Sequence, residues 1–124
     1  MVYKLTIIGK LDNLNDYITA CRTNQYKGAK LKHHNEHKVV YAIYEQLGRL
    51  RINNPVYMTY RWYEPDRRRD LDNISSFGRK VIQDALVETH VLKNDGWKEI
   101  IGFKDEFYVD RNNPRIEVEI EVVE

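Results

Sequence analysis

The sequence predicts an α+β fold, a single domain over residues 1–124 in which helices flank a mixed or antiparallel sheet. The stretch from Val56 to Tyr63 alternates with a period of two, as a β-strand does. The stretch from Ile74 to Leu86 repeats its apolar residues at helical spacing. A length of 124 residues suits one domain and is too short for two. The predicted order of elements is strand, helix, helix, strand, helix, strand, strand.

The N-terminal half contains the first strand and two helices of this order. Val2–Gly9 is rich in strand-forming residues and ends at a glycine. Residues 13–23 predict a short helix with one of its asparagines as N-cap. The polar, glycine-containing stretch 24–30 predicts a non-helical break between this helix and the next. The next helical segment ends at Gly48, which has the position of a C-cap.

The C-terminal half supplies the remaining strands and the clearest helix. Residues 53–65 predict a strand with large side chains on both faces, and therefore a central one. A helix from Asn73 follows; its apolar face consists of Ile74, Phe77, Val81, Ile82, Ala85 and Leu86. Residues 99–110 and 115–123 are separated by a turn at 111–114, which predicts an antiparallel hairpin. In the last strand the isoleucines and valines are expected to point inward and the glutamates toward water.

The charge balance excludes a protein that coats DNA with a globally basic surface, because 20 Lys and Arg stand against 19 Asp and Glu. Basic residues nevertheless cluster in one segment: Arg22, Lys27, Lys30, Lys32 and Lys38. His33, His34 and His37 lie in the same segment, but no cysteine or acid completes a zinc site with them. The segment is either a second DNA-contacting surface or a solvated helix face.

The remaining composition indicates a cytoplasmic protein. No apolar run approaches the roughly 20 residues that a membrane-spanning helix needs. The apolar stretch at the N-terminus is too short for a signal peptide. The single cysteine, Cys21, excludes an internal disulfide and is expected to be buried. We expect Trp62 and Trp97 to lie in the core or in an interface.

The segment "RRRDLDN" contains the candidate chemistry. Asp70 and Asp72 lie between the end of a predicted strand and the start of a predicted helix. In an extended segment, residues i and i+2 point the same way, so the two carboxylates would converge. Such a pair repels unless a proton, a cation or a strong donor lies between its members, and Mg²⁺ is a natural choice. Alternatively, Asp72 caps the helix and Asp70 pairs with an arginine.

A third acid, Asp95, follows the same predicted helix in "LKNDGW". A helix of about 14 residues would place Asp95 some 20 Å from the other two aspartates. It reaches them if the loop folds back along the sheet edge, or if a second subunit supplies it. Both routes stay open.

These residues carry a resemblance to a known family. "RRRDLDNISSFGRKVIQDAL" followed by "VLKNDGW" resembles the RusA-type Holliday junction resolvases (crossover junction endodeoxyribonucleases), which phages and prophages commonly encode. The signature is a basic run, D-L-D-N, an amphipathic helix containing "DAL", and acids after a hydrophobic turn. The match is strongest from Arg67 to Ile100, and the predicted order of elements fits along the whole chain.

The resemblance implies a Mg²⁺-dependent endonuclease, with Mn²⁺ as an alternative ion, that acts in DNA recombination and repair. It would act as a homodimer and resolve four-way junctions by paired symmetric nicks, through attack of a metal-activated water. Asp70, Asp72 and Asp95 correspond to the family's catalytic, metal-binding acids. Arg69 and Asn73 fall at positions that belong to the site.

One departure from the family pattern concerns Ser76, which stands where the family often has a lysine. Arg79 and Lys80 lie one turn further on, and we hypothesise that one of them replaces the missing charge. Asn94–Asp95 also reduces the family's acidic pair to its second member.

The three arginines, Arg67, Arg68 and Arg69, are expected to bind backbone phosphates that flank the cut. Lys27, Lys30 and Lys32 belong to the candidate second DNA surface. Two rival functions remain: a RusA-like module that binds branched DNA without cutting it, and a nuclease with another substrate, such as RNA or a flap.

Overall fold

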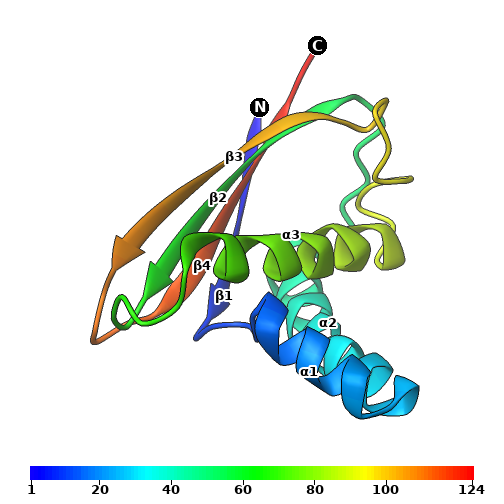
Figure 1. Ribbon diagram of the computed structural model, residues 1–124. Coiled ribbons are helices and arrows are strands. Elements are labelled where there is room, and N and C mark those ends of the chain that lie inside the picture. Colours follow the sequence, from blue (N-terminus) through cyan, green and yellow to red (C-terminus); the bar gives the residue numbers. More distant parts are fainter.

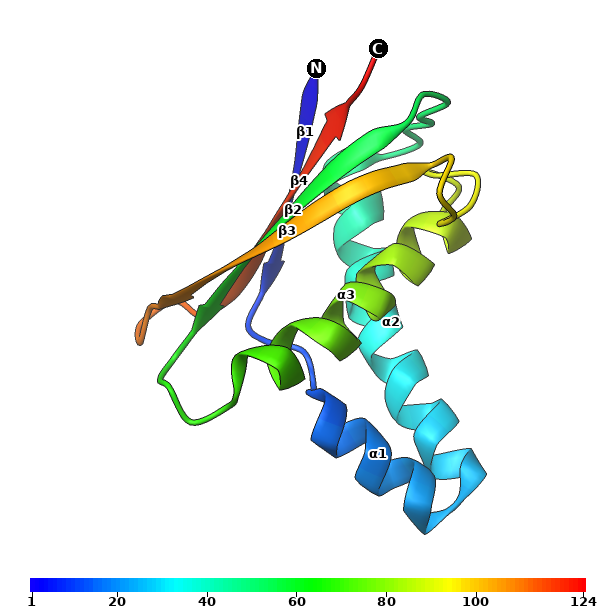
Figure 2. The ribbon, with the colours of Figure 1, turned by 45° about the horizontal axis from the view of Figure 1, so that its top comes forward.

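The computed structural model describes residues 1–124 and has the predicted order of elements. The elements are β1 (Val2–Ile8), α1 (Leu14–Thr23), α2 (Gln25–Leu47), β2 (Val56–Glu64), α3 (Leu71–Glu88), β3 (Ile100–Val109) and β4 (Arg115–Val122). The three helices lie on one side of the sheet, and the other face of the sheet carries no helix (Figures 1 and 2). The predicted α+β class is confirmed. No helix combines the length and apolar character needed to cross a bilayer.

The sheet is mixed, as predicted, with the strand order β1-β4-β2-β3. β2 pairs with β3 in parallel and with β4 antiparallel, and β4 also pairs antiparallel with β1. The predicted hairpin of the last two strands is therefore wrong, because β2 lies between them. The side chains explain the arrangement: β4 buries Ile116, Val118 and Ile120 and takes an interior place, whereas β3 has no fully buried residue and takes the edge.

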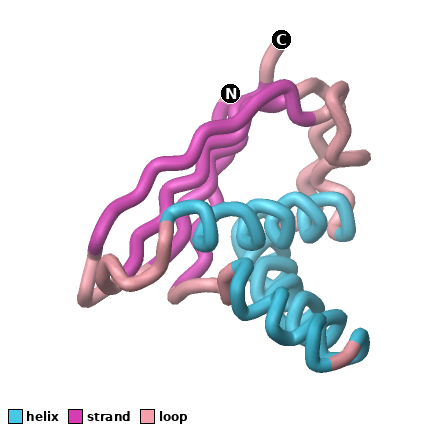
Figure 3. The backbone as a smooth tube through the Cα atoms, in the orientation of Figure 1, coloured by secondary structure: helices cyan, strands magenta, loops and turns pink.

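The two N-terminal helices form a hairpin with almost no connecting loop (Figure 3). Asn13 caps α1 in a capping box with Asp16. Asn24 caps α2, which continues through residues 25–30, so the predicted break there is wrong. A Cβ on Gly28 would lie 2.5 Å from Sγ of Cys21, so the glycine permits close packing of α1 on α2. Cys21 itself is exposed, contrary to the prediction, because α1 contains no buried residue.

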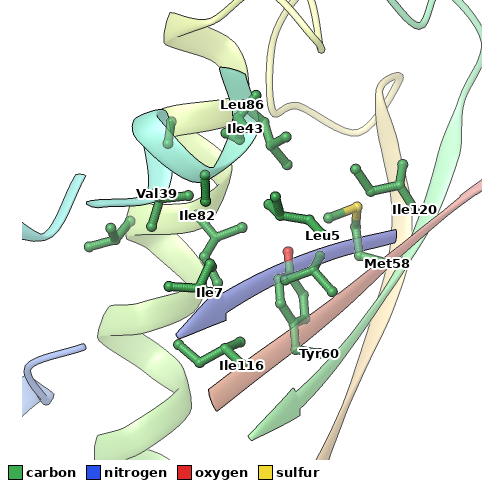
Figure 4. Packing of buried hydrophobic residues seen from close by; sticks show 14 of the residues in the cluster. Leu5, Ile7, Val39, Ile43, Met58, Tyr60, Ile82, Leu86, Ile116 and Ile120 are labelled. Carbon is green, nitrogen blue, oxygen red and sulfur yellow. The ribbon is translucent and has the colours of Figure 1, made fainter. Parts of the chain in front are cut away.

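The core lies between the helices and the sheet. Figure 4 shows side chains from β1, β2 and β4 meeting those from α2 and α3, among them Leu5, Met58, Tyr60, Val39 and Ile82. The apolar face predicted for α3 is buried as expected. Trp62 is also in the core, and its ring would be 2.7 Å from a Cβ on Gly78. This glycine therefore permits the close approach of α3 to the sheet.

The path of α3 determines where the candidate site lies. This helix connects β2 to the parallel strand β3 and runs back along the sheet, so β2, α3 and β3 form a βαβ unit (Figure 1). The start of α3 consequently lies at the carboxyl ends of β2 and β3. This is the end of an α/β unit at which ligands commonly bind.

Candidate active site

Asp70 immediately precedes α3, and Asp72 lies in the first turn of this helix. The helix begins at Leu71, before the predicted start at Asn73, and Asp70 is its N-cap residue with extended backbone angles. Its side chain makes no capping hydrogen bond. The predicted convergence through alternation in an extended chain is therefore wrong, and so is the alternative that Asp72 caps the helix. Both residues are exposed, and the neighbouring Arg68 and Arg69 pair with other acids.

A cavity of about 720 Å³ adjoins Asp70. Its lining combines charged and apolar side chains, namely Glu64, Asp66, Arg67, Arg69, Asp70, Leu71, Ile74, Phe107, Tyr108 and Val109. Asp72 does not line it. The cavity lies where β2 and β3 end and α3 begins, and its charged part is formed by Glu64 at the end of β2 and by the loop that carries the arginines.

The three arginines have different environments. Arg69 is largely buried and forms two hydrogen bonds with the carboxylate of Glu64, of 2.9 and 2.8 Å. It also donates to the carbonyl oxygen of Leu11 at 2.8 Å. Arg67 is exposed, and the side chain of Arg68 is 90% exposed, with one long contact of 3.6 Å from its guanidinium to Asp66. Arg69 thus fastens the loop to β2, while Arg67 and Arg68 remain accessible to an anion.

The third acid, Asp95, does not join the other two within the chain. Its carboxylate is 3.1 Å from Nζ of Lys80, which also contacts Asp84 at 3.0 Å. The hydrogen bond from Lys80 to Asp84, and then the one to Asp95, raise the pKa of Lys80. Lys80 lies ten residues beyond Asp70 along α3, which corresponds to about 15 Å. No three acidic, histidine or cysteine side chains gather into a metal site in this chain.

Ser76, which stands where the family often has a lysine, and the basic residues that follow it also form hydrogen bonds within the chain. The hydroxyl of Ser76 donates to the carbonyl of Asp72 at 2.7 Å. The guanidinium of Arg79 bonds to Asp105 on β3 and stacks over the ring of Phe103, 4.5 Å from its centroid. Asn73 is half-buried near the helix start. Replacement of the lysine by Arg79 or Lys80 stays a prediction, and both side chains would first have to leave their carboxylate partners.

Comparison with known families decides the relationship of the chain. Residues 12–121 match the family described as Endodeoxyribonuclease RusA. The chain belongs to this family. RusA proteins are endodeoxyribonucleases that resolve Holliday junctions, so the family as a whole acts on branched DNA. A search of curated proteins found no match for the chain.

The basic segment of this RusA-family chain is divided between free and paired side chains. Lys27 and Lys30 are exposed on α2. Lys32 instead contacts Asp84 on α3 at 2.9 Å and Glu36 at 3.7 Å. The hydrogen bond to Asp84 raises the pKa of Lys32. The histidines at 33, 34 and 37 are exposed as well. A second DNA surface here stays a prediction, and it would depend on Lys27 and Lys30 more than on Lys32.

Two features of the RusA domain were not anticipated from sequence. The first is Glu64, a buried carboxylate at the end of β2. A signal existed, because Glu64 continues the inward-facing series of Val56, Met58, Tyr60 and Trp62, and a buried charge requires a partner. The second is Trp97, which is 97% exposed. It does not lie in the core.

Proposed function

We propose that this RusA-family protein is a Mg²⁺-dependent endodeoxyribonuclease that resolves four-way DNA junctions as a homodimer, through paired symmetric nicks. The observation that carries the proposal is that Asp70 and Asp72 are exposed and have no cationic partner. Both carboxylates are exposed at the start of α3, and the nearby arginines do not neutralise them. Acids without partners beside a cavity at the carboxyl end of a βαβ unit favour a ligand site over a structural charge cluster.

The donors at this position fit Mg²⁺. This ion prefers oxygen ligands and is usually held by one or two carboxylates together with water and substrate phosphate. Asp70 and Asp72 would hold it. When bound, the ion supplies charge neutralisation and an activated water for phosphodiester hydrolysis. The first N–H groups of α3 lack partners within the helix and favour a phosphate at the same place.

The protein's own side chains would bind and orient the DNA strand. Arg67 and Arg68 are exposed beside the cavity and would bind the phosphates that flank the cut. Arg69, bound to Glu64 and to the carbonyl of Leu11, would position the loop and with it Asp70. In this assignment Arg69 acts through the loop and does not touch the substrate.

Asp95 would be supplied to the site by a second copy of the chain. Within one chain it pairs with Lys80, about 15 Å along α3 from Asp70. A pair of chains related by a two-fold axis presents two identical sites, which matches the approximate two-fold symmetry of a four-way junction and its two cuts. Each site would then combine Asp70 and Asp72 of one copy with Asp95 of the other.

The test compares a synthetic four-way junction with linear duplex of the same sequence, in Mg²⁺ and in EDTA. We expect symmetric nicks in the junction only, with Mg²⁺ present. Asp70→Asn should abolish them. Asp66→Asn is the matched control, because Asp66 lines the same cavity but contacts Arg68, and it should retain cleavage. Binding of the junction without nicks would contradict the proposal, and cleavage by Asp70→Asn would contradict the site.

A second candidate function is a RusA-like module that binds branched DNA without cutting it. The observation in its favour is the lack of a free cation after the D-L-D-N motif. Ser76 replaces the family's lysine, while Arg79 and Lys80 are held by Asp105 and Asp95. The same assay separates the candidates, because this module would shift the junction in a gel and leave its strands intact. Equal cutting of RNA or of flaps would instead indicate another nuclease specificity.

A further inference from the structure

The solvent face of α2 combines aromatic and basic side chains. Asn35, Val39 and Ala42 are buried on the opposite face, where the helix contacts α1, α3 and β1. Residues three or four positions apart lie on one face of a helix. The solvent face, hereafter the α2 row, consists of six exposed residues at this spacing: Tyr26, Lys30, His33, His37, Tyr41 and Tyr44. No helix or strand of the chain covers the α2 row.

The three tyrosines of the α2 row contribute little to the packing of the domain. Tyr26 is 72% exposed, Tyr41 is 66% exposed and Tyr44 is 55% exposed. None of them belongs to the hydrophobic core or to the partly buried side chains that pack against it. Single exposed apolar residues are ordinary, whereas a group of them on one surface indicates a binding site. The rings are therefore available to a ligand that stacks on them.

The charges around these rings have one sign. The only acid among residues 25–44, Glu36, is half-buried and contacts Lys32 at 3.7 Å, beside the ion pair of Lys32 with Asp84 on α3. The exposed lysine and histidine side chains in this range are Lys27, Lys30, His33, His34, His37 and Lys38. An anionic ligand on the α2 row thus meets basic groups and no exposed carboxylate before Glu45.

A hollow of about 370 Å³ adjoins the C-terminal half of the α2 row, between α2 and the edge strand β1. Its lining includes apolar, basic and acidic side chains, from Ile8, His37, Lys38, Tyr41, Ala42 and Glu45. The apolar part gives a planar base a place beside Tyr41, with a phosphate at Lys38. Glu45 is compatible with a base there, because a carboxylate accepts a hydrogen bond from an exocyclic amino group.

We propose that the α2 row binds an unpaired DNA strand, with bases stacked on its tyrosines and phosphates bound by its basic side chains. Proteins bind single strands by this combination, since aromatic rings stack on any base and a positively charged surface follows the backbone. In a duplex the bases stack on one another, and the three exposed rings would have no stacking partner. The strand is DNA because the family acts on DNA.

The length of the α2 row sets the size of the site. Tyr26 and Tyr44 are 18 residues apart, which corresponds to about 27 Å along the helix. This distance spans about eight nucleotides at the stacked spacing of about 3.4 Å, and fewer when the strand is extended. The site goes beyond the proposed function, because a fully paired four-way junction contains no such strand. A strand bound here would belong to DNA with a gap or a displaced end.

The test measures binding by fluorescence anisotropy in EDTA, so it requires no nuclease activity. The probes are an oligothymidylate of about 12 nucleotides and an abasic strand of the same length, which has the same phosphates but no bases. We expect wild type to bind the oligothymidylate at least about fivefold more tightly than the abasic strand.

Two triple variants isolate the contribution of the rings. Tyr26→Ala, Tyr41→Ala and Tyr44→Ala combined should abolish the preference for the strand with bases. The matching combination of Tyr→Phe substitutions at the same three positions keeps the rings and should retain it. Trp97→Ala is a further control, because Trp97 is 97% exposed but lies outside α2, and its loss should leave the affinity unchanged.

The salt dependence of binding isolates the contribution of the charges. For a single strand, each phosphate contact adds about 0.7 to the slope of log affinity against log salt concentration. Lys30→Ala should therefore reduce that slope by about 0.7 for both probes. The triple alanine variant should leave the slope unchanged, because it removes rings and no charge.

The outcomes separate this surface from the proposed function. Equal affinity of wild type for the two probes, or a preference for bases that survives in the triple alanine variant, would overturn the proposal. Either result leaves the nuclease standing. A wild-type protein that shows the expected preference but cuts no junction would support this surface and contradict the nuclease.

Discussion

The pair formed by Arg69 and Glu64 offers a quantitative test of how the loop beside Asp70 is held. Both oxygens of Glu64 accept hydrogen bonds from Arg69, at 2.9 and 2.8 Å. The Glu64 side chain is 8% exposed and that of Arg69 is 16% exposed. Removal of one partner leaves a charge in an environment with little water. Breaking a buried ion pair in this way typically costs about 3–5 kcal/mol.

The two single substitutions should differ in cost. Arg69→Ala leaves the more buried group, Glu64, without its two donors, and we expect a loss of about 4 kcal/mol in the free energy of unfolding. Glu64→Ala leaves Arg69 bound to the carbonyl of Leu11 and partly in water, and the expected loss is nearer 3 kcal/mol. Replacement of both residues by methionine removes both charges and should cost about 1 kcal/mol or less.

Urea unfolding at neutral pH measures these differences. With a slope of about 2 kcal/mol per molar urea, Arg69→Ala should lower the midpoint by about 2 M. The slope itself should not change. If the double alanine variant loses the sum of the two single losses, or if each single loss is below about 1 kcal/mol, the pair contributes no more than an exposed ion pair and the reasoning is refuted.

Three further predictions concern packing, pH and the metal. Gly78→Ala should destabilise the domain by about 1–3 kcal/mol in thermal unfolding, because the new Cβ would lie 2.7 Å from the ring of Trp62. The hydrogen bond from Arg61 lowers the pKa of Glu119 in the folded protein. This bond therefore stabilises the fold fully above the pKa that Glu119 has in the unfolded chain, and the stabilisation is lost as the pH falls through the lower pKa of the folded state. The stability of wild type should therefore fall more steeply than that of Arg61→Met below about pH 4.5, as urea midpoints at successive pH values would show. Mg²⁺ should raise the melting temperature of wild type but not of Asp70→Asn, and EDTA should reverse the rise; an equal rise in both would contradict the assignment of Asp70.

Local patterns predicted the elements whose neighbours in sequence are also their neighbours in space. The helical spacing of apolar residues in α3 and the alternation of side chains in β2 reflect which faces of these elements are buried. Both elements were identified correctly. The assignment of Asp70 to the junction of β2 and α3 was also correct, whereas Asp72 lies in the first turn of α3. The start of α2 was missed because Gly28 signalled a break. Gly28 instead lies within α2 and permits the close approach of Cys21 on α1.

Long-range arrangement was not accessible from these patterns. The turn at 111–114 suggested a hairpin, but β2 takes β4 on one edge and β3 on the other, and only the burial of complete strands decides that order. Asp95 could be recognised as part of the family motif, whereas its pairing with Lys80 depends on the path of the loop. The exposure of Trp97 likewise follows from the tertiary structure.

Subunit mixing tests the central claim, that a metal-dependent nuclease site combines Asp70 of one copy with Asp95 of another. Asp70→Asn and Asp95→Asn are refolded separately and together, and each sample is assayed with Mg²⁺ on a four-way junction. Each variant alone should be inactive. Random pairing in the mixture leaves about a quarter of all sites with both aspartates, so nicking should return at about that fraction of the wild-type rate, in one strand per junction. A mixture as inactive as its components, beside refolded wild type that cuts, would contradict the claim.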